Sequence, residues 1–110
     1  MKYQIEITAA AERDMIQAAD YIEFVLKNPK ATDDLLNEAE KQINSLSEFP
    51  AKFQLVDDPV LASWGIRFVS VKNYLAFYLI NSDRNTVIIV RFLYQKSEWK
   101  SILRKGVPLI

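Results

Sequence analysis

The sequence contains no cysteine and no histidine, and only two of its 110 residues are glycine. The missing cysteines and histidines exclude disulfide bonds, thiolate nucleophiles, zinc fingers, Ser-His-Asp triads and imidazole general bases. Because Gly65 and Gly106 stand alone, the chain also lacks a glycine-rich loop that could cradle phosphate or a dinucleotide. Any chemistry therefore falls to arginine, lysine, tyrosine, tryptophan and carboxylate side chains.

Long apolar runs are absent as well. No stretch of about 18 apolar residues could cross a membrane, and the first residues lack the pattern of a secretory signal. Half of the residues are hydrophobic and a quarter are charged, as is typical of a soluble globular protein. At 110 residues the chain suits one domain and is too short for two ordinary ones. We expect a single cytoplasmic domain over residues 1–110, with no membrane partner.

The net charge of zero conceals an opposition between the two halves of the chain. Residues 1–60 carry six basic and twelve acidic side chains, a balance of −6, whereas residues 61–110 carry eight basic and two acidic ones, a balance of +6. Such asymmetry indicates that the C-terminal half meets an anionic partner, either nucleic acid or an acidic protein segment. The alternative is that the two halves attract each other within the fold.

Hydrophobic periodicity predicts an N-terminal strand followed by two helices. Residues 3–7 alternate as a half-buried strand does, and Thr8 can cap a helix over residues 9–26. The predicted buried stripe of that helix consists of Met15, Ile16, Ala19, Ile22, Val25 and Leu26. Asn28-Pro29 matches the cap and first-turn proline of a second helix, which ends before Pro50. So short a connection predicts an antiparallel helical hairpin.

Three strands are predicted in the C-terminal half. Residues 66–71 and 74–80 are joined by Lys72-Asn73, in which the asparagine can adopt the left-handed conformation that a tight hairpin requires. The strand over residues 86–94 has a continuously apolar centre, which is typical of a central strand covered on both faces. A short helix is predicted just after residue 97.

The predicted fold class is therefore α+β, with an N-terminal strand, an antiparallel helical hairpin, a three-stranded antiparallel meander and a short C-terminal helix. We expect the hairpin to pack on one sheet face and the other face to remain partly open to a ligand.

Arginine and tyrosine side chains are interleaved along the three C-terminal strands: Arg67, Tyr74, Tyr78, Arg91 and Tyr94, with Lys72, Lys96 and Trp99 at the strand ends. Guanidinium groups bind phosphate and aromatic rings stack on bases, so the pattern suits single-stranded nucleic acid. For Tyr74 and Tyr78 the alternative is ordinary packing. Arg91 follows four apolar residues and needs a partner, either a structural carboxylate or carbonyl or a ligand phosphate. If the hairpin covers the face of residues 66 and 68, Arg67 emerges on the open face.

The chain has two adjacent carboxylate pairs, Asp33-Asp34 and Asp57-Asp58. Neighbouring residues of a helix do not share a face, and no third ligand stands at a suitable spacing. We interpret the first pair as favourable charge near a helix start and the second as a turn or short helix start. No metal site and no cofactor are predicted.

Several segments, in one order and register over about residues 3–103, resemble the RelE/ParE superfamily of bacterial toxins. They are the start YQIEITAAAERD at residue 3, the helix end DYI at 20, the helix exit LSEFP at 46, the strand pair GIRFVSVKNYLAFY at 65, and the final strand VIIVRFLYQKSEW at 87. The resemblance implies the toxin of a type II toxin–antitoxin operon. Its partner would be an antitoxin whose acidic, partly disordered C-terminal segment lies across the basic strands.

The resemblance implies two alternative targets. RelE-like members enter the ribosomal A site and cleave mRNA, whereas ParE-like members inhibit DNA gyrase and cleave nothing. The first prediction is a ribosome-dependent endoribonuclease with Arg67, Arg91 and Tyr94 as catalytic residues, and with Lys72, Lys96 and Trp99 binding nucleic acid. Leu93 stands where some nucleases have a catalytic histidine, which favours the ParE-like alternative. A further alternative is a non-toxic binding module on the same fold.

Overall fold

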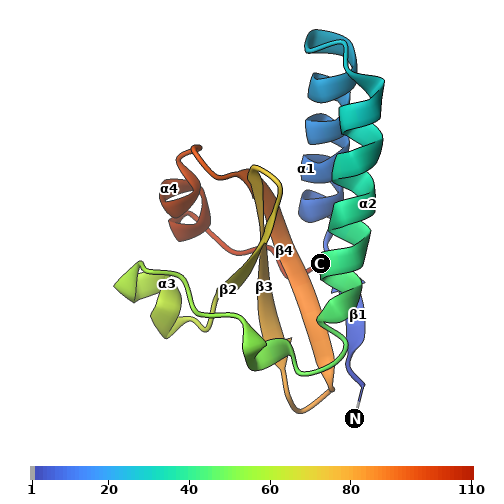
Figure 1. Ribbon diagram of the computed structural model, residues 1–110. Helices are drawn as coiled ribbons and strands as arrows, with labels where there is room; N and C mark the ends of the chain where they lie inside the picture. Colours follow the sequence, from blue (N-terminus) through green and yellow to red (C-terminus); the bar gives the residue numbers. More distant parts are fainter. Residues whose placement is uncertain (1) are drawn as a thin grey trace.

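The computed structural model describes residues 2–110 as one mixed sheet with helices on both of its faces (Figure 1). The strands follow the spatial order β1 (Gln4–Ile7), β4 (Thr86–Tyr94), β3 (Tyr74–Asn81) and β2 (Arg67–Val71). β1 runs parallel to β4, and the other two pairings are antiparallel, so the three C-terminal strands form the expected meander. The predicted α+β fold class is confirmed, and the apolar strand β4 is central.

The helical hairpin consists of α1 (Ala9–Asp20) and α2 (Pro29–Ser45), and its tip projects beyond the sheet (Figure 1). The Thr8 hydroxyl accepts a hydrogen bond from the Ala11 amide at 3.1 Å, and the Asn28 side chain accepts one from the Ala31 amide at 3.1 Å. Both predicted caps are therefore present. The first helix departs from the prediction at its end, where η1 (Tyr21–Val25) is a π-helical turn closed by the Leu26 amide on the Tyr21 carbonyl at 3.1 Å.

The hairpin covers one sheet face and forms a first core with it. Small and branched side chains of the helices, including Ala18, Leu35, Ala39 and Ile43, meet the inward residues of the strands, which are Val69, Val71, Tyr78, Val87, Ile89 and Phe92. Along β2 these positions alternate, as the pleat of a strand requires, whereas in β4 they step from Ile89 to Phe92. Full burial of each large apolar side chain contributes roughly 1.5–3 kcal/mol.

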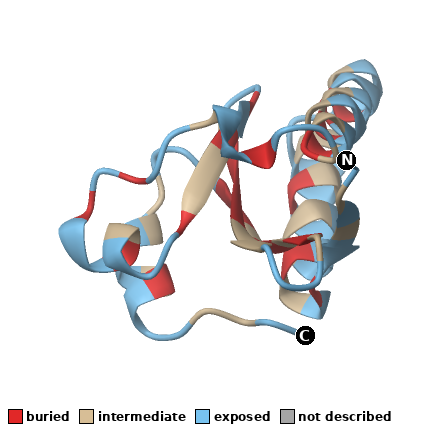
Figure 2. Cartoon of the chain, turned by 90° about the horizontal axis from the view of Figure 1, so that it is seen from below, coloured by how far each residue is buried: buried red, intermediate tan, exposed pale blue. Residues whose placement is uncertain are grey.

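The second sheet face is covered too, which corrects the expectation of an open face. The short helices α3 (Pro59–Ser63) and α4 (Trp99–Arg104) bury Leu61 and Leu103 against Phe77, Val90 and Leu93. Figure 2 shows the buried residues of the sheet lying between these helices and the hairpin, whose outward surface is exposed. A ligand-binding surface must therefore lie at the ends or edges of the sheet.

The second acidic pair joins α3 to α4. The Asp58 carboxylate caps α3 by accepting hydrogen bonds from the Val60 and Leu61 amides at 2.9 and 3.1 Å, and it also binds Arg104 at 2.7 Å. Burial raises the pKa of Asp58, but these donors outweigh that effect and lower it overall. Neighbouring Asp57 pairs with Lys100 at 3.2 Å. The predicted short helix start is confirmed at Asp58, which caps α3.

Candidate functional site

A groove of about 690 Å³ lies between the hairpin tip and the turn-side end of the sheet. One wall comes from η1 and α2, and the other comes from the β2–β3 turn and the end of β4. The groove is lined by Tyr21, Ile22, Leu26, Ala31, Asp34, Leu35, Lys72, Asn73, Tyr74 and Tyr94. It therefore combines an apolar helical wall with a polar strand wall, as binding sites commonly do.

Three tyrosines meet where this groove adjoins a smaller cavity of about 210 Å³. Tyr74 lies at the centre, stacked on Phe92 with ring centroids 5.1 Å apart and edge-on to Tyr94 at 5.7 Å, and Tyr21 completes the wall from η1. Burial and the neighbouring phenols Tyr21 and Tyr94 raise the pKa of Tyr74. Tyr74 is therefore a neutral packing group, and its environment opposes formation of a phenolate base.

The β2–β3 turn brings two of the predicted nucleic-acid-binding lysines to this end of the sheet. The Gln95 amide donates a hydrogen bond to the Asn73 carbonyl at 2.9 Å, so the chain after β4, with exposed Lys96, passes beside the turn that carries Lys72. The left-handed residue of the turn is Lys72, with φ of 56°, and not Asn73 as predicted. A left-handed residue with a side chain is strained relative to glycine.

This strain leads to a stability prediction. Lys72→Gly is expected to raise the free energy of unfolding by about 0.5–1 kcal/mol, because glycine adopts positive φ without a steric penalty. Urea denaturation measures the change. Lys96→Gly is the matched control, since it removes the same charge from a position without positive φ, and it should bring no gain. An equal or larger gain for Lys96→Gly would show that lost charge, and not relieved strain, causes the effect.

The tip of the hairpin exposes apolar side chains that the sequence pattern assigned differently. Phe24, Val25 and Leu26 are 66%, 62% and 56% exposed, although Val25 and Leu26 belonged to the predicted buried stripe, and Tyr21 is half exposed. The prediction was wrong because the π-helical turn ends the regular helical spacing and the tip projects past the sheet. The available signal was a run of six residues with five apolar ones, more than one helix face can bury. Exposed apolar patches of this kind often mark protein-binding surfaces.

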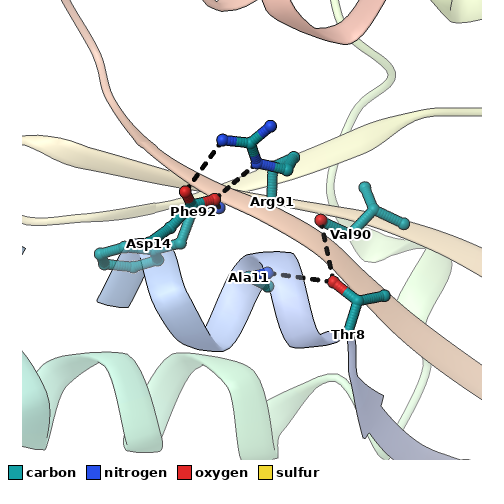
Figure 3. A network of polar contacts seen from close by, with 6 residues as sticks. All are labelled: Thr8, Ala11, Asp14, Val90, Arg91 and Phe92. Atoms are coloured by element: carbon teal, nitrogen blue, oxygen red, sulfur yellow. Dashed lines mark hydrogen bonds and ion pairs between the residues drawn. The ribbon is translucent and has the colours of Figure 1, made fainter. Parts of the chain in front are cut away.

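Arg91 does not face the groove, because α1 holds its guanidinium (Figure 3). Its Nε and Nη2 atoms donate to the Asp14 carboxylate at 2.6 and 2.9 Å, and the Phe92 amide donates to the same carboxylate at 3.0 Å. The hydrogen bond with Asp14 is the main cause that raises the pKa of Arg91. The structural carboxylate partner considered for Arg91 is therefore present.

The bond to Asp14 coincides with a β-bulge. Phe77 pairs with Arg91 but Tyr78 pairs with Ile89, which leaves Val90 as the extra residue of β4. The Thr8 hydroxyl donates to the Val90 carbonyl at 3.0 Å (Figure 3). Two side chains, Thr8 at the cap of α1 and Asp14 in its middle, thus form hydrogen bonds with the irregular backbone of the central strand.

Arg67 lies at the other end of the sheet, beside a separate cavity of about 620 Å³. Its register partner is Tyr78, four residues along β3 from Tyr74, which corresponds to about 13 Å. Arg67 shares the alternation of Val69 and Val71, so it lies on the hairpin side of the sheet and not on an open face. Its Nη1 atom donates to the Phe53 carbonyl at 2.6 Å. The structure therefore does not bring Arg67, Arg91 and Tyr94 together, and their catalytic roles stay predictions.

Trp99 packs into the second core. Its ring contacts Phe77 with centroids 5.0 Å apart, and the Lys100 ammonium lies 5.4 Å from the Trp99 centroid. This packing leaves the ring half-buried, between the core and a lysine. A base-stacking role for Trp99 is a prediction that this packing does not favour.

Much of the basic charge of the C-terminal half is paired with acids of the N-terminal half. Four of its eight basic residues form such pairs, namely Arg84–Glu6, Arg91–Asp14, Lys100–Asp57 and Arg104–Asp58. The opposite charges of the two halves are thus partly compensated within the fold. Across residues 2–110 no group of three or more acidic side chains could hold a metal ion. None of the helices in the same residues is long and apolar enough to span a membrane.

Two solved structures are similar to this chain in fold. One is the toxin–antitoxin complex RelBE2 from Mycobacterium tuberculosis, with a TM-score of 0.58 and 19% identity over 86% of this chain and 99% of that one. The other is the chromosomal ParDE toxin–antitoxin system from P. aeruginosa, with a TM-score of 0.67 and 15% identity over 84% of this chain and 96% of that one. At such identities the likeness is one of fold. No curated protein matches the chain significantly.

The sheet order and the hairpin on one face define the fold class, which both neighbours share. The family model for the ParE toxin of the type II toxin–antitoxin system parDE matches residues 5–99. The chain therefore belongs to the ParE toxin family.

Proposed function

We propose that this toxin inhibits DNA gyrase, as ParE-like members of the superfamily do, and that it cleaves no RNA. The observation that carries the proposal is the engagement of Arg91 by Asp14 at 2.6 and 2.9 Å. A guanidinium held by a carboxylate in this way has little positive charge to offer a phosphate. Arg67 is also separated from Tyr94 by the length of the β2–β3 hairpin.

The groove itself supports the same conclusion. Cleavage of RNA by attack of a 2′-hydroxyl needs cations that stabilise the pentacoordinate phosphate and lower the pKa of a base. The groove has one basic lining residue, Lys72, and an acidic one, Asp34. Its central phenol, Tyr74, has a raised pKa. These features suit a protein-binding surface better than a phosphodiesterase site.

We assign the contact with gyrase to the hairpin tip, defined by Tyr21, Phe24, Val25 and Leu26. The side chains of Phe24, Val25 and Leu26 are more than half exposed. The tip lies beyond the sheet, where a large partner can reach it. The proposed antitoxin is an acidic protein whose segment covers the toxin and prevents this contact. Expression without the antitoxin is then expected to arrest growth, and normal growth would favour the non-toxic module.

Purified components separate the two activities. We expect the toxin to inhibit supercoiling by gyrase and to accumulate gyrase–DNA cleavage complexes, while mRNA in a cell-free translation reaction stays intact. Phe24→Asp should reduce gyrase inhibition at least tenfold, because burying an aspartate at an apolar contact is unfavourable. Glu23→Gln, a change of nearly equal size at the half-buried neighbouring residue, serves as the control. New mRNA ends at the A site together with unaffected supercoiling would contradict the proposal.

A second candidate, the RelE-like endoribonuclease, is favoured by one observation: Lys72 and Tyr94 line the same groove. It makes a different prediction for Tyr94→Phe, which removes only a hydroxyl. Toeprinting should show cleavage by the parent protein and none by the variant. Under gyrase inhibition the same substitution leaves mRNA intact in both proteins.

A further inference from the structure

We infer that the cavity at Arg67 binds a carboxylate side chain of the antitoxin, with a neighbouring apolar side chain of the same peptide packed on Phe49. The inference rests on the proposed toxin–antitoxin function and adds a site and a ligand chemistry to it. The cavity has a volume of about 620 Å³. It lies at the end of the sheet opposite the groove that Tyr21, Tyr74 and Tyr94 line. Its walls include Tyr3, Phe49, Leu55, Arg67 and Ile80.

Arg67 differs from half-buried Arg91 and from exposed Arg104. Arg91 and Arg104 each bind a carboxylate, with closest distances of 2.6 and 2.7 Å. Arg67 is half-buried as well, yet within residues 2–110 its only hydrogen bond goes to the Phe53 carbonyl, and no acid pairs with it. A guanidinium has five donors and needs a partner when it is taken out of water. The donors that Phe53 leaves free can therefore bind an anion that enters the cavity.

Phe49 supplies the second observation. It is 73% exposed, and it adopts a left-handed conformation with φ of 56° and ψ of 62°. A bulky residue in this region is strained, and an aromatic ring in water contributes nothing to the core. The backbone of Phe49 is thus strained, while its side chain does not stabilise the isolated fold. Its position beside Arg67 gives the cavity an apolar platform next to a cation.

The lining favours a carboxylate over a phosphate or a nucleic acid. Arg67 is the single basic residue among the lining residues, and most of the remaining wall is apolar. Nucleic-acid affinity depends on several phosphate contacts by basic groups, which one guanidinium cannot provide. One carboxylate matches one guanidinium fork, and an adjacent leucine or aromatic side chain matches the apolar wall. A peptide in which an acidic residue is flanked by apolar residues matches this lining.

Nuclear magnetic resonance titration of the full chain tests the site. The probes are the blocked tripeptides acetyl-Leu-Asp-Leu-amide and acetyl-Leu-Asn-Leu-amide, with inorganic phosphate as a separate arm. We expect the aspartate peptide to shift the Arg67 side-chain Nε–H resonance and the Phe49 and Leu55 amides, and to bind at least tenfold more tightly than the asparagine peptide. The inference would be overturned if the two peptides bound equally well, if phosphate bound more tightly, or if no peptide bound. Resonance shifts confined to the groove lined by Tyr21, Tyr74 and Tyr94 would also overturn it.

Variants complete the test. Arg67→Gln should weaken the aspartate peptide at least tenfold, whereas Arg84→Gln, which also removes one positive charge but from an exposed loop, should have no effect. Phe49→Gly should weaken the peptide while the melting temperature stays the same or rises, because strain is relieved. An unchanged affinity in Arg67→Gln contradicts the site. Since the titration involves no gyrase, a negative result with intact gyrase inhibition rejects this inference alone.

Discussion

Replacement of Asp14 by alanine is expected to lower the free energy of unfolding by about 2–3 kcal/mol, among the largest effects of any single polar substitution in this chain. The substitution removes three hydrogen bonds, of 2.6, 2.9 and 3.0 Å, from the bulge of the central strand. The side chains of Asp14 and Arg91 are only 9% and 24% exposed, so water compensates the abandoned guanidinium in part. Because water reaches this pair in part, the expected loss of stability is smaller than the roughly 3–5 kcal/mol of a fully buried pair.

A double-mutant cycle separates the ion pair from other effects of the substitution. Asp14→Ala, Arg91→Ala and the double variant are compared by urea denaturation, and we expect a coupling energy of about 1.5–2 kcal/mol. Glu12→Ala is the matched control, because Glu12 is an exposed acid in the first turn of the same helix and should cost less than about 1 kcal/mol. A loss for Asp14→Ala no larger than that of the control would mean that the clamp contributes little. Gyrase inhibition measured on the folded variant then shows whether Arg91 has any role besides this one.

The secondary structure follows from local features of the sequence. The caps Thr8 and Asn28, the alternation in the strands and the acidic start of α3 each act within a few residues, and all are present in the structure. The end of the first helix was predicted less well. The π-helical turn at Tyr21 depends on how the chain reverses toward Asn28, and helical periodicity contains no information about that reversal.

The arrangement of the candidate site could not be derived in the same way. Arg91 and Asp14 are 77 positions apart, and no local pattern links a strand arginine to a particular helix acid. Alternation correctly separated Arg67 from Phe68, but it could not show which face the hairpin would cover. The covering of the second face depends on helices of five and six residues, which bury it only after the chain has folded. Sequence therefore identified residues of chemical interest without their partners.

Alkaline pH is expected to destabilise the protein through Tyr78. This ring is fully buried, and its hydroxyl donates a hydrogen bond to the Pro50 carbonyl at 2.6 Å. Burial raises the pKa of Tyr78 from 10 to about 12, although the charge of Arg67 acts in the opposite direction. In the unfolded chain the phenol ionises near pH 10, so the contribution of Tyr78 is complete below that pH and is lost as pH rises toward 12. The upper limit of the loss is about 2.7 kcal/mol.

Tyr78→Phe isolates this contribution from the other groups that titrate in the same range. At pH 7 the variant should be less stable by about 1 kcal/mol, because the buried Pro50 carbonyl loses its donor. Between pH 10 and 12 its stability should fall less steeply than that of the parent protein, so the difference narrows or reverses. Urea denaturation at pH 7, 10, 11 and 12 measures both proteins. Parallel curves would mean that the Tyr78 phenol reaches water in the folded state, and the assignment of Pro50 as its partner would then be wrong.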